Sequence, residues 1–341
     1  MIKSRKMFWF GIILSLALII LLVQRTDIHK LALAFRQANY LYCLPVIAVA
    51  LLGILIRAYR WGHILAPLHR ASRKNLFSAM MIGFMAIDIL PARIGEVARA
   101  VLIGRKEPIS KTSALATIVV ERLFDIFTLL LLLVWVLFAM SHSTLPPVYI
   151  RTLKAGGTMM AALFVGVLLF LVFLRFNTGV ALNFVRFCLR PFPHSLQTKT
   201  LELMDSFVAG LTTIRMGRDL LWIIFYSVLL WSLYGIGNLF MLRSFGIRTP
   251  VYVPFYLVIV QAFAVGIPSS PGFVGTYDAA VVAGLAPFHA DEAVRLSFAL
   301  LSHFLIFLPV ILYGLILLWR EHLTLDVLER EAGTEPEETE G

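Results

Sequence analysis

The stretch FMAIDILPARIGEVARA, residues 84–100, is charged and broken, although it lies between long apolar runs of the same chain. Ionisable groups at membrane depth are costly and usually face a cavity or one another. A helix that breaks there must also satisfy its freed backbone groups within the protein. The stretch therefore indicates a specialised membrane segment. Its charged residues and helix breakers are Asp88, Pro91, Arg93, Gly95, Glu96 and Arg99.

The composition of the whole chain is that of a membrane protein. Of its 341 residues, 60% are hydrophobic and 15% are charged, whereas soluble domains usually carry about 25% charged residues. In so apolar a chain, the net charge of +10 places Lys and Arg in cytoplasmic loops facing anionic lipid and not on a nucleic-acid interface. Cys43 and Cys188 lie far apart, so they do not have the spacing of metal ligands, and we expect no structural disulfide.

Long apolar runs predict the helices that cross the bilayer. Each run is near or above about 20 residues, the length a helix needs to cross about 30 Å of hydrocarbon. The first run follows a basic flank and has no small-residue cleavage site after it, so we expect an uncleaved spanning helix. The predicted spans are, approximately, residues 7–24, 41–57, 113–140, 156–174, 219–242 and 297–319.

Two further segments each consist of two short apolar arms around a break. Residues 75–104 break at PARIG, and residues 251–287 break within IPSSPGFVGT. Residues 94–104 would rise only about 16 Å as a helix, which is too short to cross. Basic clusters on both sides of the first segment belong on the same, cytoplasmic side if positive residues face inward. Both segments are therefore predicted to be re-entrant hairpins that enter from opposite faces.

These segments predict an all-α polytopic membrane protein with about six spanning helices and two re-entrant helical hairpins, about eight membrane segments in all. The order span, span, hairpin, span occurs twice in opposite orientations, which is typical of an inverted-topology repeat with a transport site near the midplane. One transmembrane domain is expected over residues 1–320, with halves at about 7–140 and 156–320. We expect it in the plasma (inner) membrane, with both termini cytoplasmic.

Two polar segments lie outside the predicted spans. The basic linker 175–218 is expected to be cytoplasmic, and the apolar residues of 195–219 follow one helical stripe. That stripe suits either an interfacial helix on the inner surface or a cytosolic helix packed on the bundle. The tail 321–341 is rich in Glu and is expected to be disordered.

VVERLFDIF, inside the third predicted span, carries a second group of charges. Glu121 and Asp125 share a helix face, so the two carboxylates would repel each other without a cation between them. Arg122 can pair with Asp125, but Glu121 then needs a partner, for which Arg93 or Arg99 of the first hairpin is the obvious candidate. A structural ion cluster and a substrate or proton role are both compatible with this pattern.

In the opening stretch, Arg93, Glu96 and Arg99 would form a plus-minus-plus ladder on one face if a helix begins at Gly95. Pro91, just before that arm, suits a tight hairpin tip. In a structural interpretation, Arg99 extends to the cytoplasmic surface and Glu96 neutralises an arginine. In a functional one, the arginines bind a lipid phosphate, for which the guanidinium fork is well suited.

The second break, within IPSSPGFVGTYDAA, frees backbone groups at membrane depth, which requires surrounding protein or a water-filled cavity. Asp278, which follows Tyr277 at the start of the second arm, is expected to be a helix cap or else a cation or proton site. His303 is expected to be a satisfied histidine of the bundle interior. The predicted hairpin backbone positions here are Ser269, Ser270, Pro271, Gly272 and Gly275.

No zinc-type HExxH, GxSxG or phosphate-cradling motif occurs in the sequence. We therefore predict no metal, no cofactor and no catalytic residue, and expect a non-enzymatic lipid translocator. The alternatives are a membrane-embedded lipid-modifying enzyme that uses Glu121 or Asp125 as acid or base, and a non-catalytic scaffold. The expected partners are membrane lipids and, in addition, a separate lipid-synthesis enzyme or glycosyltransferase.

ILPARIGEVARAVLI, VVERLFDIFTLLLLL and IPSSPGFVGTYDAAVV occur in this order. Over about residues 7–320 the chain thereby resembles the transmembrane flippase-like domain of lysylphosphatidylglycerol synthases, which has stand-alone relatives. The resemblance implies movement of an anionic or aminoacylated phospholipid, or a polyisoprenoid-linked lipid, between leaflets. Because only about 20 residues follow the last span, we expect no synthetase domain and no lipid aminoacylation.

The resemblance also marks positions in the three motifs. In the second hairpin, this chain has Phe273 and Asp278 where the commoner family pattern has a second Gly and a Glu, which bears on the substrate. The predicted headgroup site comprises Asp88, Arg93, Glu96, Arg99, Glu121, Arg122, Asp125, Tyr277 and Asp278.

Overall fold

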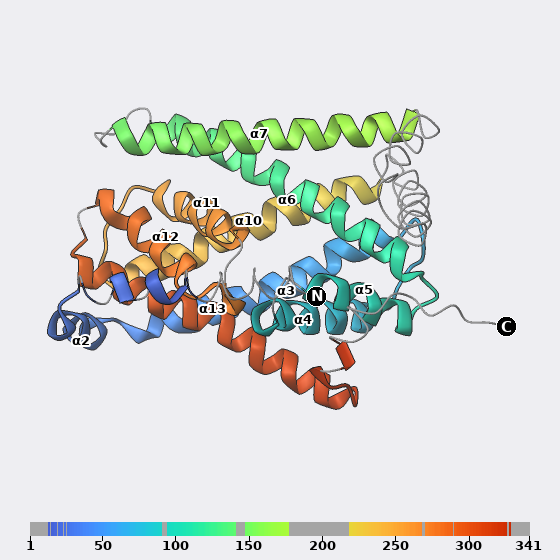
Figure 1. Ribbon diagram of the computed structural model, residues 1–341, viewed down its shortest axis with the longest axis horizontal. Coiled ribbons are helices and arrows are strands. Elements are labelled where there is room, and N and C mark those ends of the chain that lie inside the picture. Colours follow the sequence, from blue (N-terminus) through green and yellow to red (C-terminus); the bar gives the residue numbers. More distant parts are fainter. Residues whose placement is uncertain are drawn as a thin grey trace.

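The computed structural model describes residues 27–90, 94–140, 147–176, 218–267, 270–288, 290–325 and 327–328, and several residues between 13 and 26. These described parts are helices joined by short turns, without a strand among them (Figure 1). The predicted all-α class is therefore confirmed. Of the other expectations, the helix at 195–219 lies almost entirely outside the described residues, as does half of the first span.

Four helices are long and apolar enough to cross a membrane, and each coincides with a predicted span. They are α3 (Cys43–Leu65), α6 (Lys111–Met140), α10 (Arg218–Ser244) and α13 (Glu292–Arg320). A further helix, α7 (Pro147–Phe176), covers the predicted span 156–174. It packs on α6, since a Cβ atom on Gly157 would lie 2.3 Å from Leu133, and it runs along the outer edge of the molecule (Figure 1).

The opening stretch contains the end of α4 (Arg73–Ile89) and the start of α5 (Ile94–Lys106), two antiparallel helices. A Cβ atom on Gly95 would lie 2.1 Å from the carbonyl oxygen of Gly83 and 2.5 Å from the backbone nitrogen of Ile87. Gly83 in turn lies beside Arg99. Because residue 83 faces 99 while 87 faces 95, the helices run in opposite directions. Glycine permits the close approach that directs Arg99 into the bundle.

A second helical hairpin occupies the other broken segment. It consists of α11 (Val253–Gly266), the turn η3 (Pro271–Phe273), α12 (Thr276–Leu285) and the turn η4 (Ala286–Phe288). Gly272 and Gly275 have φ angles of +68° and +84°, a region that favours glycine. A Cβ atom on Gly272 would lie 3.3 Å from the backbone carbonyl of Asp88, so the turns of the two hairpins are in contact.

The first residues of the predicted disordered tail, 321–325 and 327–328, are described and pack on the bundle, while the rest of the expectation stays a prediction. Leu323 and Leu325 pack against the buried cluster formed by α3, α4 and α5, and Leu328 is only 1% exposed within it. These apolar side chains bury against the bundle although acidic residues surround them in sequence. At the other end of the described chain, α2 (Ile28–Gln37) begins at Asp27, whose carboxylate accepts from two backbone N–H groups.

Candidate functional site

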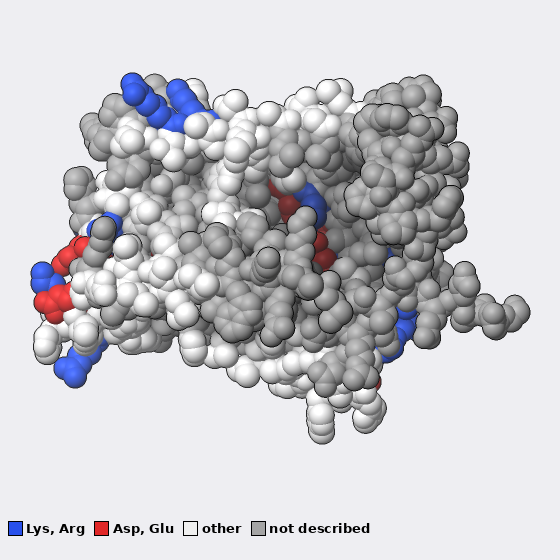
Figure 2. Space-filling view, viewed as in Figure 1, with Lys and Arg blue, Asp and Glu red and all other residues white. Residues whose placement is uncertain are grey.

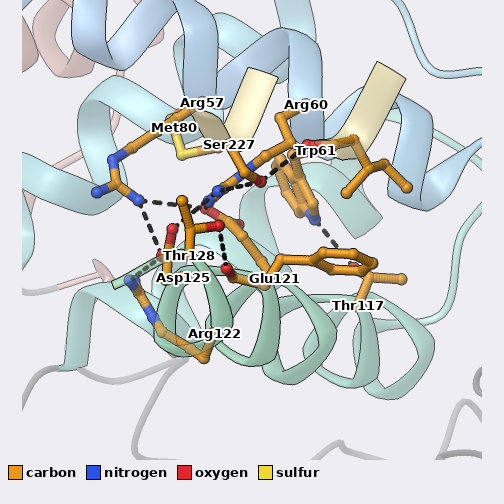
Figure 3. Close-up of polar contacts among 12 residues, drawn as sticks. Arg57, Arg60, Trp61, Met80, Thr117, Glu121, Arg122, Asp125, Thr128 and Ser227 are labelled. Carbon is orange, nitrogen blue, oxygen red and sulfur yellow. Dashed lines mark hydrogen bonds and ion pairs between the residues drawn. The ribbon is translucent and has the colours of Figure 1, made fainter. Parts of the chain in front are cut away.

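Glu121 and Asp125 of α6 lie at the centre of a buried ionic network (Figure 3). Glu121 accepts from Arg60 at Oε1 (3.0 Å) and from Arg99 at Oε2 (2.6 Å). Asp125 accepts from Arg60 at Oδ1 (2.8 Å) and from Arg57 at Oδ2 (3.2 Å). All four carboxylate oxygens are thus engaged by guanidinium groups, from α3 and from α5.

Arg60 supplies the cation that the two neighbouring carboxylates require. One terminal nitrogen donates to Glu121, while the other donates to Asp125 and to the Ser227 hydroxyl of α10 at 3.0 Å. The side chain is fully buried. The planar guanidinium fork is suited to such a bridge because its donors have fixed directions.

Aromatic side chains enclose two of the other arginines. The guanidinium carbon of Arg99 lies 4.4 Å from the ring centre of Trp61. That of Arg57 lies 5.2 Å from the ring centre of Phe84, and its Nε donates to the Tyr234 hydroxyl at 3.3 Å. Cation–π contacts of this kind stabilise desolvated cations, so these arginines are held firmly around the carboxylates.

Arg122 and Glu96 form the half-exposed rim of the network. Arg122 donates to Asp125 at 3.2 Å and pairs with Glu96 of α5 at 3.1 Å. Their side chains are 31% and 28% exposed, whereas those of Arg60 and Glu121 are fully buried. Figure 2 shows acidic and basic side chains in a hollow of otherwise uncharged described atoms, in the region that α6 crosses in Figure 1.

The network carries an excess of positive charge. Among the described residues, four guanidinium groups face three carboxylates, which leaves one positive charge over if all of them are ionised. The side chain of Asp88, near the end of α4, is buried and has no hydrogen bond or ion pair within the described part of the chain. Its carboxyl group therefore does not neutralise the excess through a direct contact with any described residue.

The structure separates the predicted site residues. Arg99 pairs with Glu121 and Arg122 pairs with Asp125, as the spacing suggested. Arg99 is 2% exposed, so it does not extend to the surface, and Glu96 pairs with Arg122 instead. Glu96 and Arg99 thus both pair with α6, while the part of the predicted ladder that involves Arg93 stays a prediction. Pro91, Arg93 and Ser269, which were also predicted to contribute, lie outside the described residues.

Arg57 and Arg60 are the members that sequence reasoning missed. Their positions at and just beyond the end of the predicted span 41–57 assigned them to the cytoplasmic face. In the structure, α3 continues to Leu65 and both arginines are buried. The unmet need of Glu121 for a cation was the available signal, because two arginines three residues apart on a neighbouring helix can meet carboxylates four apart.

Tyr277 and Asp278 belong to a second polar group, in α12, which has no hydrogen bond or ion pair to the network among the residues that the structure describes. Asp278 accepts from the backbone N–H of Gly275 at 2.9 Å, so it caps the helix, and it also faces His303 of α13. The Tyr277 hydroxyl is bonded to Gln261 at 2.9 Å. Within the described ranges, no three His, Cys, Asp or Glu side chains gather as metal ligands.

Comparison with known proteins agrees with this architecture. The family described as the lysylphosphatidylglycerol synthase TM region matches residues 8–314. The UPF0104 membrane protein MJ1078 of Methanocaldococcus jannaschii is 22% identical over 250 residues, which are 73% of this chain and 96% of that protein.

A second relative from the same organism, the UPF0104 membrane protein MJ1595, is 22% identical over 315 residues, 88% of this chain and 91% of that protein. No solved structure matches the chain significantly. The family match covers most of the chain, including both hairpins and the ionic network. The chain therefore belongs to the lysylphosphatidylglycerol synthase transmembrane-region family and is a multi-pass membrane protein.

Proposed function

We propose that the chain is a lipid translocator, which moves an anionic or aminoacylated phospholipid or a polyisoprenoid-linked lipid between leaflets. The observation that carries this proposal is the excess positive charge of the buried network, together with its half-exposed rim at Arg122 and Glu96. One charged residue at the centre of a spanning helix costs about 2.5–3.5 kcal/mol on insertion scales. A buried ion cluster is also a poor way to gain stability, because apolar packing often does as well.

In this proposal, the phosphate of the lipid binds Arg122 and displaces Glu96. Arg122 keeps one terminal nitrogen on Asp125 and has the other on Glu96, the contact that the phosphate would take over. Asp125 stays held by Arg57, at the oxygen that it shares with Arg122, and by Arg60 at its other oxygen. The arginine therefore exchanges one carboxylate for a phosphate without leaving its position.

The lipid chains would follow the apolar surface of α6, which continues beyond the rim. Phe127, Leu131, Val134 and Phe138 are all exposed on this helix. At 3.6 residues per turn these residues lie on the other side of α6 from Arg122, so the lipid chains would pass around the helix from the headgroup site to reach them.

The two hairpins supply the proposed means of access from each side. We propose that both are re-entrant and related by an inverted repeat, that six helices span the inner membrane and that both termini are cytoplasmic. The contact between Gly272 and Asp88 would then close the path between the two faces. Acid–base chemistry at the network is disfavoured, because every oxygen of Glu121 and Asp125 already has a guanidinium partner.

Native mass spectrometry of the protein released from vesicles of mixed phosphatidylglycerol and phosphatidylcholine tests the headgroup site. The wild type should retain phosphatidylglycerol preferentially, and Arg122→Gln should lose that preference. Arg151→Gln is the matched control, since Arg151 is an exposed arginine of α7. Equal retention by Arg122→Gln and the control would remove the rim from the mechanism.

A further inference from the structure

His303 lies between two groups that are both expected to accept hydrogen bonds. Its Nε2 is 2.8 Å from the backbone carbonyl oxygen of Gly272, at the turn of the second hairpin. Its Nδ1 is 3.1 Å and 3.2 Å from the two carboxylate oxygens of Asp278. A carbonyl oxygen can only accept, so Nε2 must carry a hydrogen in this arrangement.

With Nε2 protonated, a neutral ring would present a lone pair at Nδ1 to the oxygens of Asp278. An ionised carboxylate there would place two acceptors face to face. The observed geometry therefore requires one more proton between Nδ1 and Asp278, whether it resides on the ring or on the carboxyl group. Asp278 also accepts from the backbone N–H of Gly275, so its orientation is fixed independently of the histidine.

The charges around this pair differ from those of the arginine network. Among the described residues, His303 is the sole ion-pair partner of Asp278, so the charge that balances the carboxylate is itself titratable. The Tyr277 hydroxyl is engaged by Gln261, and Arg295, earlier in α13, donates to the carbonyl of Val282.

From α4, Asp88 packs its backbone carbonyl against Gly272. The side chains of His303 and Asp278 are 13% and 3% exposed, so the ring is the member of the pair with some access to its surroundings. A proton could therefore reach the pair through His303.

We propose that Asp278 and His303 together bind one proton, and that this proton is the coupling ion of the lipid translocator proposed above. Only the coupling part of this inference rests on the proposed function, and the proton site does not depend on it. When the proton is lost, the neutral ring can adopt either of two tautomers. One keeps its hydrogen on Nε2, bonded to the Gly272 carbonyl, and its Nδ1 lone pair then repels Asp278. The other carries its hydrogen on Nδ1, bonded to Asp278, and loses the hydrogen bond to Gly272. Either change alters the turn that contacts α4.

The proton site is tested on the full-length protein in nanodiscs, by ¹⁵N spectra of histidine-labelled samples and by counting protons released in a pH titration. The wild type should release one proton more than His303→Gln, and the His303 signal should move in the same step. Asp278→Asn, which keeps an oxygen for the Gly275 N–H, should lack this step as well. The control is His69→Gln, which should leave the His303 signal and its step unchanged, because the partly exposed imidazole of His69 faces Glu107 instead.

A proton count that is unchanged in both His303→Gln and Asp278→Asn would overturn the inference. So would a His303 ring that stays unprotonated at Nδ1 beside an ionised Asp278. A variant that fails to fold is recognised by its near-ultraviolet spectrum, and the remaining variant then decides.

The coupling part is tested in vesicles with a pH difference across the membrane. One pH unit is a tenfold ratio of proton activity, so one-to-one coupling shifts the leaflet distribution of labelled phosphatidylglycerol by up to about tenfold. His303→Gln should abolish the shift, and a shift that persists would overturn the coupling. If the wild type moves no lipid at all, the proposed function fails, while the proton count still decides the proton site.

Discussion

Replacing Arg60 by methionine is the sharpest test of how the network holds the bundle together. The change removes donors to Glu121, Asp125 and Ser227 at 2.8–3.0 Å from a side chain that is fully buried. Removing one partner of a buried ion pair usually costs about 3–5 kcal/mol, because the remaining charges stay desolvated. We expect a loss of unfolding free energy in this range, since Glu121 and Asp125 keep other partners but lose the cation between them.

The double variant Arg60→Met with Glu121→Leu separates this electrostatic effect from a packing defect. It removes one charge of each sign, so the excess of one positive charge is restored. Because Glu121→Leu also removes the carboxylate of Arg99, the double variant is compared with both single variants. We expect it to be about 1–3 kcal/mol more stable than the sum of the two single losses predicts, a typical coupling between residues in one network. The assay is reversible unfolding in mixed micelles, with Arg151→Met as the exposed control. A single variant as stable as that control, or losses that simply add, would refute the reasoning.

Three further predictions concern a tightly packed glycine, an unpacked glycine and a hydrogen-bonded carboxylate. Gly95→Ala should destabilise the protein by at least about 1–3 kcal/mol through overpacking against Gly83. Gly166→Ala, where a Cβ atom meets no described atom within 4 Å, should be neutral or stabilising in the same unfolding assay. Outside the membrane segments, hydrogen bonds from the Ser72 backbone and Asn75 lower the pKa of Glu107, against the effect of its partial burial. At pH values above the usual glutamate pKa, Glu107 therefore stabilises the folded protein. This stabilisation is lost as the pH falls through the lower pKa that Glu107 has in the folded state. The melting temperature of Glu107→Gln should therefore be less sensitive to acid than that of the wild type.

Much of the architecture is predictable because it depends on local pattern. The length of each apolar run determines where α6, α10 and α13 form, and the Pro and Gly residues of the two broken segments determine where the hairpins turn. The pairing of Arg99 with Glu121 could also be inferred, since two carboxylates on one helix face need a cation. These inferences require only short-range periodicity and charge balance.

The remaining part of the site depends on contacts between residues distant in sequence. Arg60 and Glu121 are 61 positions apart, and nothing local distinguishes an arginine that faces a carboxylate from one in a basic loop. The end of α3 was therefore placed too early, because charge was taken as the end of the span. His303 of α13 presents the same difficulty, since its partners Gly272 and Asp278 belong to the turn and the second arm of the second hairpin.

Lipid movement in vesicles measures the proposed function most directly. The purified protein is reconstituted at one copy or fewer per vesicle, and the rate at which fluorescent phosphatidylglycerol becomes accessible to an external quencher is recorded. We predict rapid movement with the wild type and with Arg151→Gln, and at least about a tenfold slower rate with Arg122→Gln, because a charge-assisted phosphate contact is worth about 1.5–3 kcal/mol. Equal rates for all three proteins, or no movement above that of empty vesicles, would contradict the proposal.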